Sequence, residues 1–132
     1  MADDIFCKIV VGEIPAYKVF EDKDFLAFLE INPIRLGHTL VIPKKHFNTV
    51  YEMDDELYAG LFLLAKKLAP AVKSATGSDK VGLAVAGFHL DHANVHILPM
   101  DVIADIDFAN QHPESAAELS RMAAKIQAEV DC

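Results

Sequence analysis

Residues 87–99 read Gly-Phe-His-Leu-Asp-His-Ala-Asn-Val-His-Ile-Leu-Pro, the most informative stretch of the chain. From position 92 it places His92, Asn94 and His96 at every second residue, separated by small or β-branched residues. Side chains alternate between the two faces of an extended strand, so the spacing predicts a strand with these three on one face. Polar rings and an amide on an otherwise apolar strand need hydrogen-bonding partners, and a phosphate-sized ligand would supply them.

The pattern of apolar residues on either side of this stretch predicts an α+β domain. An acidic start at 54–56, a helical repeat of leucines and a final Gly77 indicate a long helix, in which Pro70 should kink or loosen the last turns. A second helix is expected from 113–115 to about residue 130. We expect a short helix or turn over 4–10 and strands over 17–21, 25–29, 39–43, 81–85 and 91–98. Short turns between such strands are typical of an antiparallel sheet.

The spacing of His92, Asn94 and His96 resembles the signature of the histidine triad (HIT) family, His-φ-His-φ-His-φ-φ, where φ is apolar. Other segments resemble family landmarks in family order, and together they cover about residues 4–99; they lie at 5–10, 12–15, 28–33 and 37–46. The resemblance implies one HIT domain over residues 1–132, with the tail and C-terminal helix over 100–132. It also implies a five-stranded sheet that pairs across a homodimer.

The resemblance implies a nucleotidyl hydrolase or transferase. In the family the middle histidine attacks the α-phosphorus of a nucleotide and forms a nucleotidyl-imidazole intermediate, which water then hydrolyses. By position, Asn94 occupies the place of this nucleophile, His92 is the orienting residue and His96 donates to the phosphate. His38 matches a fourth family histidine close to the phosphate. The implied substrate is a purine nucleotide, either a nucleoside phosphoramidate or a dinucleoside polyphosphate, and no cofactor is implied.

Asn94 is the main departure from the family pattern. The lone pair of a carboxamide nitrogen is delocalised into the carbonyl, so the group can donate a hydrogen bond but is a poor nucleophile. We therefore expect the chain to bind a nucleotide while its chemistry fails. Two explanations are open: a deliberate His-to-Asn substitution that traps a nucleotide complex, or a natural relative that serves as a nucleotide sensor. We favour the first, because the rest of the site looks intact.

The resemblance also indicates where the sugar and base would bind. Glu30, followed by Ile31, stands where the family more often has Asp to hold the ribose. Gly87 would let the backbone approach the phosphate, although a bulge without a ligand role is equally compatible. Residues 101–108 are expected to influence substrate choice from the leaving-group side. Apolar residues that could sandwich the base, or simply form the core, are Phe6, Ile9, Phe20, Phe28 and Ile31.

Composition limits the remaining possibilities. The chain has 132 residues, a formal net charge of −8 and 52% hydrophobic residues. The negative charge argues against binding to duplex nucleic acid, which needs a basic surface. No apolar run of about 18 residues indicates a membrane span. The sequence contains only two cysteines, Cys7 and Cys132, which is typical of a reducing compartment, and we expect a cytoplasmic location.

A metal site is the third alternative, and we expect none. On a helix, His89, His92 and His96 would form a stripe able to bind zinc, but the β-branched neighbours and Pro99 argue against a helix here. His89 is instead expected at the surface. Some bacterial relatives hold zinc with Cys-x-x-Cys and a later histidine. Here Asp4 stands at the position of the first cysteine. Only Cys7 and His46 of that zinc-ligand set are therefore present, and the cysteine pair is half missing.

Overall fold

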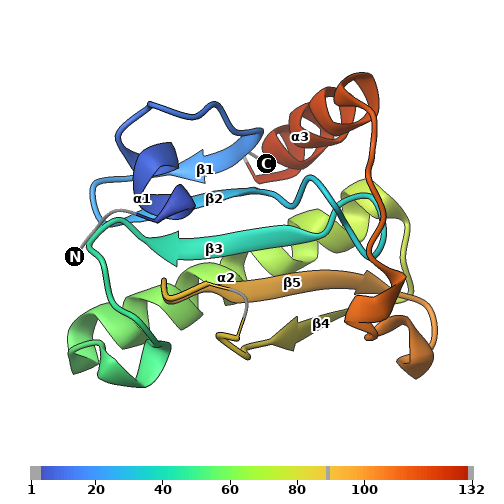
Figure 1. Cartoon of the computed structure of the whole chain (residues 1–132). Helices are drawn as coiled ribbons and strands as arrows, with labels where there is room; N and C mark the ends of the chain where they lie inside the picture. The colour runs from blue at the N-terminus through green and yellow to red at the C-terminus, as the bar shows by residue number, and fades with distance from the viewer. Residues whose placement is uncertain (1–3, 89, 131–132) are drawn as a thin grey trace.

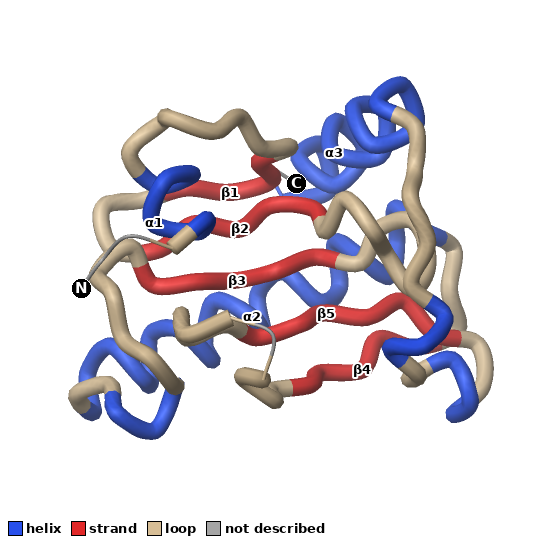
Figure 2. Tube along the Cα trace, viewed as in Figure 1, coloured by secondary structure: helices blue, strands red, loops and turns tan. Residues whose placement is uncertain are grey.

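The computed structural model describes residues 4–88 and 90–130. One five-stranded antiparallel sheet forms its centre, with strands in the order β1-β2-β3-β5-β4 (Figures 1 and 2). The predicted α+β class, with an antiparallel sheet, a long helix and a C-terminal helix, is confirmed. The strands are β1 (Lys18–Glu21), β2 (Phe25–Leu29), β3 (Thr39–Pro43), β4 (Lys80–Ala84) and β5 (Val95–Met100).

The hairpin of β1 and β2 is closed by an Asx turn. The Asp22 carboxylate accepts hydrogen bonds from the backbone N–H groups of Asp24 and Phe25, at 2.9 and 2.8 Å. Aspartate favours such turns because its short side chain can satisfy backbone donors two or three residues on. This turn sends β2 back through the middle of the sheet, where all five of its residues are buried.

Helix α2 (Asp55–Thr76) covers one face of the sheet and forms the main core with it (Figure 1). Its buried positions recur at helical spacing and include Leu61, Leu68 and Val72. Pro70 is exposed and does not end the helix, which continues to Thr76 and stops at Gly77 in the left-handed conformation. Helix α3 (Ala116–Val130) packs beside α2 and β1.

The opposite face of the sheet carries a smaller apolar cluster and the side chain of His96. Because side chains alternate along a strand, the odd residues of β2 face α2 while Leu26 and Phe28 face away. Helix α1 (Ile5–Val10) packs on them through Ile9, and Asp4 caps its first turn by accepting from the Cys7 N–H at 2.7 Å. Leu40 of β3 pairs with His96 of β5, which places His96 on this second face.

The last strand differs from the prediction at its start. We predicted a strand from residue 91, but β5 begins at Val95, and residues 91–94 form a bend and an irregular segment before it. His92 and Asn94 therefore lie outside the regular strand. Within the described ranges, no helix is long and apolar enough to cross a membrane.

Candidate nucleotide site

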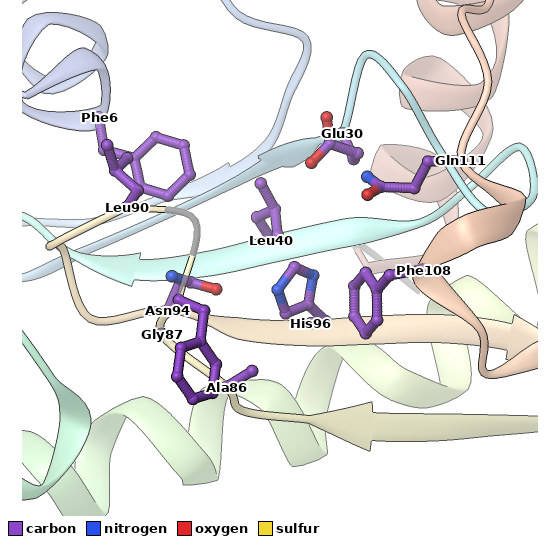
Figure 3. A pocket seen from close by; sticks show the side chains of 11 residues that line it. Phe6, Glu30, Leu40, Ala86, Gly87, Leu90, Asn94, His96, Phe108 and Gln111 are labelled. Atoms are coloured by element: carbon purple, nitrogen blue, oxygen red, sulfur yellow. The ribbon is translucent and has the colours of Figure 1, made fainter.

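A pocket opens on the sheet face opposite α2, above β3 and β5 (Figure 3). Strands supply its floor, the segment before β5 supplies one wall, and the tail after β5 supplies the other. Of the predicted site residues, it brings together Phe6, Glu30, Gly87, Asn94 and His96. The other lining residues are Leu40, Ala86, Phe88, Leu90, Phe108 and Gln111.

Asn94 is held in one orientation by the backbone. Its Nδ2 donates a hydrogen bond to the carbonyl oxygen of His92 at 2.8 Å, and the residue is buried. A carbonyl oxygen only accepts, so the nitrogen of the amide must face it. Its oxygen therefore points to the other side, and Figure 3 shows it directed toward His96.

His96 and His38 form a chain of hydrogen bonds that starts at the backbone. The Ile34 N–H donates to His38 Nδ1 at 3.1 Å, so the His38 proton must sit on Nε2. His38 Nε2 lies 2.8 Å from His96 Nδ1 and donates to it. A neutral His96 consequently carries its own proton on Nε2, the nitrogen remote from His38.

Burial keeps His38 neutral. The side chain has no solvent exposure, and this desolvation, aided by the neighbouring His96, lowers the pKa of His38 from 6.5 to about 3. A neutral imidazole fits the chain of hydrogen bonds, because an imidazolium could not accept from the Ile34 N–H. His38 therefore fixes the tautomer of His96 rather than supplying a positive charge.

The tail after β5 forms the second wall of the pocket. The Phe108 ring packs edge-on against His96, with 4.9 Å between ring centroids, and 6.1 Å from His38. Arg35, in the loop between β2 and β3, pairs with the start of this tail through Asp101 at 3.1 Å and Asp105 at 3.5 Å. The expected influence of residues 101–108 on substrate choice stays a prediction, but this segment does reach the pocket.

A second, apolar hollow adjoins the pocket and shares Phe6, Glu30, Leu40 and Leu90 with it. It contains every remaining residue predicted for the base and sugar except Phe20. Ile31 is 55% exposed at its rim, and Glu30 accepts from the Asn32 N–H at 3.1 Å. Its other lining residues are Ile5, Ile9, Ile14, Pro15, Ala16, Phe28, Leu29 and Asn32.

Of two further predicted residues, Phe20 lies away from the pocket and Gly87 lines it. Phe20 lies on β1 under the Lys67 ammonium, 4.9 Å from the ring centroid, and lines a different hollow. It packs against the main core, which is the alternative that the sequence left open. Gly87 has a φ of +76°, a conformation that favours glycine, and lines the pocket. The prediction for His89 concerns a residue outside the described ranges.

His92 departs from the prediction that all three polar side chains share one face. Its ring is fully buried and lies away from the pocket, with Nε2 donating to the Pro43 carbonyl at 3.0 Å. Nδ1 lies 3.1 Å from the Asp4 carboxylate and 3.4 Å from Cys7 Sγ. The bend before β5 turns this side chain toward α1 instead. The contact of His92 with Asn94 runs through its backbone carbonyl.

Four metal-ligating side chains meet around His92. Asp4, Cys7, His46 and His92 offer ligand atoms that all lie within 4.8 Å of one another. Four ligand atoms that include nitrogen, sulfur and oxygen suit a divalent ion with tetrahedral coordination, such as zinc. Burial raises the pKa of Asp4, but the hydrogen bond from the Cys7 N–H and the electrostatic attraction of His92 outweigh it and lower the pKa. A lowered pKa favours the ionised carboxylate, which is the form that binds metal ions.

The expectation of no metal site was reached without His92, the fourth member of this cluster. Sequence spacing alone leaves Cys7 and His46 as an incomplete set of metal ligands. The fold brings His92, which is 85 residues from Cys7 in the sequence, to the same place. The alternative helical stripe is wrong, since His92 lies in a bend and His96 in β5.

Sequence reasoning missed Phe108 and Gln111 as individual site residues. Both follow β5 in a segment without regular periodicity, and they reach the pocket because the tail folds back over the sheet. Gln111 Nε2 donates to the Asn32 carbonyl at 2.8 Å and links the tail to the loop after β2. No local pattern marks these two positions.

Comparison with known proteins identifies the domain. The HIT domain family model matches residues 11–103. The HIT protein of Bacillus subtilis is 43% identical, covering 72% of this chain and 69% of that protein. An adenosine 5'-monophosphoramidase of Schizosaccharomyces pombe is 40% identical, covering 72% of each.

Solved structures superpose on nearly the whole chain. A HIT-like protein of Bartonella henselae, described as involved in cell-cycle regulation, superposes with a TM-score of 0.88 at 32% identity, covering 98% of this chain and 97% of that one. A zinc-bound histidine triad protein of Mycobacterium smegmatis gives 0.82 at 27% identity, covering 96% and 92%. On the family match and these identities, the chain belongs to the HIT domain family.

Proposed function

We propose that this protein binds a purine nucleotide in the pocket of Figure 3 and that Asn94 occupies the position of the family's nucleophile. The observation that carries the proposal is the 2.8 Å hydrogen bond from Asn94 Nδ2 to the His92 carbonyl, beside the His38–His96 chain. An imidazole at position 94 could make the same bond through Nδ1 and keep its far nitrogen for attack. The amide has no atom in that attacking position, so the hydrolase is severely impaired.

The remaining groups suit nucleotide binding. His96 Nε2–H donates to a phosphoryl oxygen, and the backbone at Gly87 leaves room for the phosphate. The Glu30 carboxylate accepts from the ribose hydroxyls near Ile31. The apolar hollow lined by Phe6, Ile9 and Phe28 takes the base. Relatives support this class of ligand, since the Schizosaccharomyces pombe protein acts on an adenosine phosphoramidate.

Binding is tested without catalysis. Isothermal titration with AMP, GMP, CMP and UMP should show binding of the purine monophosphates and weaker binding of the pyrimidines. Absence of any nucleotide binding would overturn the proposal.

Catalysis is tested by Asn94→His. This variant should hydrolyse an adenosine phosphoramidate or a dinucleoside polyphosphate, and Asn94→Gln, which restores no nucleophile, should not. Losing a nucleophile commonly costs several orders of magnitude in rate, so the gain should be large. An Asn94→His protein that binds AMP but stays inert on both substrates would favour the alternative, a nucleotide sensor without catalytic ancestry in this site.

We also propose that Asp4, Cys7, His46 and His92 hold a structural divalent ion. Such an ion would join α1 to the segment before β5 and so hold the His92 carbonyl that positions Asn94. The zinc-bound Mycobacterium smegmatis relative supports the proposal. Metal analysis of the purified chain by mass spectrometry should find about one zinc per chain, and Cys7→Ser should lower that content.

A homodimer in the cytoplasm completes the proposed function. Strand β4 is an edge of the sheet, and Leu83 with nearby Val85 and Phe88 exposes apolar surface there. A second copy would cover this edge. Light scattering should then give twice the chain mass of 14.5 kDa, and the Leu83→Lys substitution should lower the measured mass toward that of one chain. We place no duplex nucleic acid among the partners, because the net charge is −8.

A further inference from the structure

The tail after β5 places a glutamine on the rim of the pocket beside Glu30. Gln111 donates its Nε2–H to the Asn32 carbonyl at 2.8 Å, and the Asn32 N–H donates to Glu30 Oε2 at 3.1 Å. One backbone residue therefore links the two side chains. Both line the pocket, and Figure 3 shows the Gln111 amide directed into it.

Backbone hydrogen bonds hold this part of the tail against the loop after β2. The N–H of His112 donates to the Pro33 carbonyl at 3.2 Å, and the N–H of Glu114 donates to the Ile31 carbonyl at 3.3 Å. Because these bonds lie directly after Gln111, its backbone and its side chain are both held against this loop before a ligand arrives. A side chain that is already ordered loses little conformational freedom when it binds.

The hydrogen bond to Asn32 decides which end of the Gln111 amide is left for other partners. A carbonyl oxygen only accepts, so Nε2 must face Asn32, and Oε1 is the remaining end. Among residues 4–88 and 90–130, no group donates a hydrogen bond to Gln111 Oε1. Gln111 therefore presents an acceptor to the pocket, next to the Glu30 carboxylate, which also only accepts when it is ionised.

Two neighbouring acceptors suit a ligand that carries two neighbouring hydroxyl donors. The 2'- and 3'-hydroxyls of ribose have this arrangement, whereas a deoxyribose lacks one of them. The apolar hollow proposed for the base includes Glu30 in its lining but not Gln111. Gln111 therefore belongs to the sugar side of the pocket rather than to the base side.

We infer that Gln111 is a second sugar contact, whose amide oxygen accepts from one of the two ribose hydroxyls that the proposed site otherwise leaves to Glu30. The inference rests on the proposed nucleotide site and adds a residue that determines its specificity for the sugar. Each acceptor then takes one hydroxyl. The chain selects ribonucleotides over both 2'-deoxy- and 3'-deoxyribonucleotides, and the tail supplies half of that selection.

Isothermal titration with AMP, 2'-deoxy-AMP and 3'-deoxy-AMP tests the inference. The unaltered chain should bind AMP about fivefold more tightly than either analogue, because each analogue lacks one hydrogen bond. In Gln111→Ala the preference over one analogue should disappear, and the preference over the other should remain. Gln111→Leu, which keeps the length of the side chain but accepts no hydrogen bond, should give the same result.

Gln127→Ala is the matched control. Gln127 also donates its Nε2–H to a backbone carbonyl, that of Lys18, but it does not line this pocket, so both preferences should remain. Two unchanged preferences in Gln111→Ala would overturn the inference and leave the proposed function standing. Loss of both preferences would show that Gln111 only supports the loop that carries Glu30, and would overturn its role as a contact.

The unaltered chain alone provides a further test that needs no variant to fold. Equal affinities for AMP and both analogues would overturn the inference, while the proposed nucleotide site would stand. Failure of all three nucleotides to bind would overturn the proposed function and the inference together.

Discussion

His38 Nε2 lies 2.8 Å from His96 Nδ1, and His38 Nδ1 accepts from the backbone N–H of Ile34. These two contacts settle which nitrogen of each ring carries its proton. They also require His38 to be uncharged, because both of its nitrogens are already committed to one donor and one acceptor role. His96, which lines the pocket, thus depends on a buried neighbour that does not line it.

The neutral state of His38 makes the folded protein sensitive to acid. The pKa of His38 is lowered from 6.5 to about 3. Between these two pH values His38 binds a proton in the unfolded chain but not in the folded chain. Stability from this group is complete above pH 6.5 and is lost as the pH falls from 6.5 toward 3. The loss approaches about 1.4 kcal/mol per pH unit.

His38→Gln tests this pH dependence. A glutamine amide can accept from Ile34 and donate to His96 but does not titrate. Urea denaturation at pH 7.5, 6, 5 and 4 should show a shallower loss of stability in the variant than in the unaltered chain. Parallel pH profiles would show that His38 is protonated in the folded state and that the assignment of tautomers is wrong.

His96→Ala should weaken binding of AMP by about 1–3 kcal/mol, the size of a hydrogen bond to a charged phosphate. Isothermal titration measures the change directly. His112→Ala is the matched control, since His112 is an exposed histidine in the tail. An unchanged affinity in His96→Ala would remove His96 from the nucleotide site.

The sequence predicted the strands better than the direction of single side chains near the site. Phe25–Leu29 and Thr39–Pro43 were predictable because buried strands read as apolar runs between turn residues. The period of two predicted a shared face for His92 and His96, and it failed for His92 because the strand begins only at Val95. Local periodicity cannot reveal that Asp4 and Cys7, which are distant in sequence, offer this imidazole a polar environment.

The tail shows a second limit of sequence reasoning. Phe108 reaches His96 because Asn32 and Arg35, both in the loop between β2 and β3, tie residues 101–111 back across the sheet. Each of these ties joins segments that are far apart in the chain. A spacing rule within one segment therefore has no way to find them.

Gly37, directly before His38, should tolerate no side chain. Its φ is +107°, where residues with a Cβ are strained, and an added Cβ would collide with Thr76 Cγ2. Gly77 also has a positive φ, +68°, but a Cβ there meets nothing within 4 Å. Chemical denaturation should show a loss of about 1 kcal/mol for Gly77→Ala and about 2–5 kcal/mol for Gly37→Ala.

A double variant separates backbone strain from the collision at Gly37. Thr76→Ser removes Cγ2 while its hydroxyl can still donate to the Val72 carbonyl, as Thr76 does at 2.7 Å. Gly37→Ala should therefore cost less in the Thr76→Ser background than alone. Identical costs in both backgrounds would assign the whole effect to the positive φ.

Asp4→Cys should strengthen the proposed metal site. A thiolate at this position would replace a harder carboxylate oxygen, and zinc in structural sites favours thiolate and imidazole ligands. Competition with a chromophoric chelator should show tighter zinc binding by Asp4→Cys than by the unaltered chain, and weaker binding by Cys7→Ser. If the proposed ion is bound, its removal should lower the thermal midpoint of both the unaltered chain and Asp4→Cys, because the ion would join α1 to the segment that holds Asn94. Zinc binding that is indifferent to both substitutions would place the ion elsewhere and leave Asp4 as no more than the cap of α1.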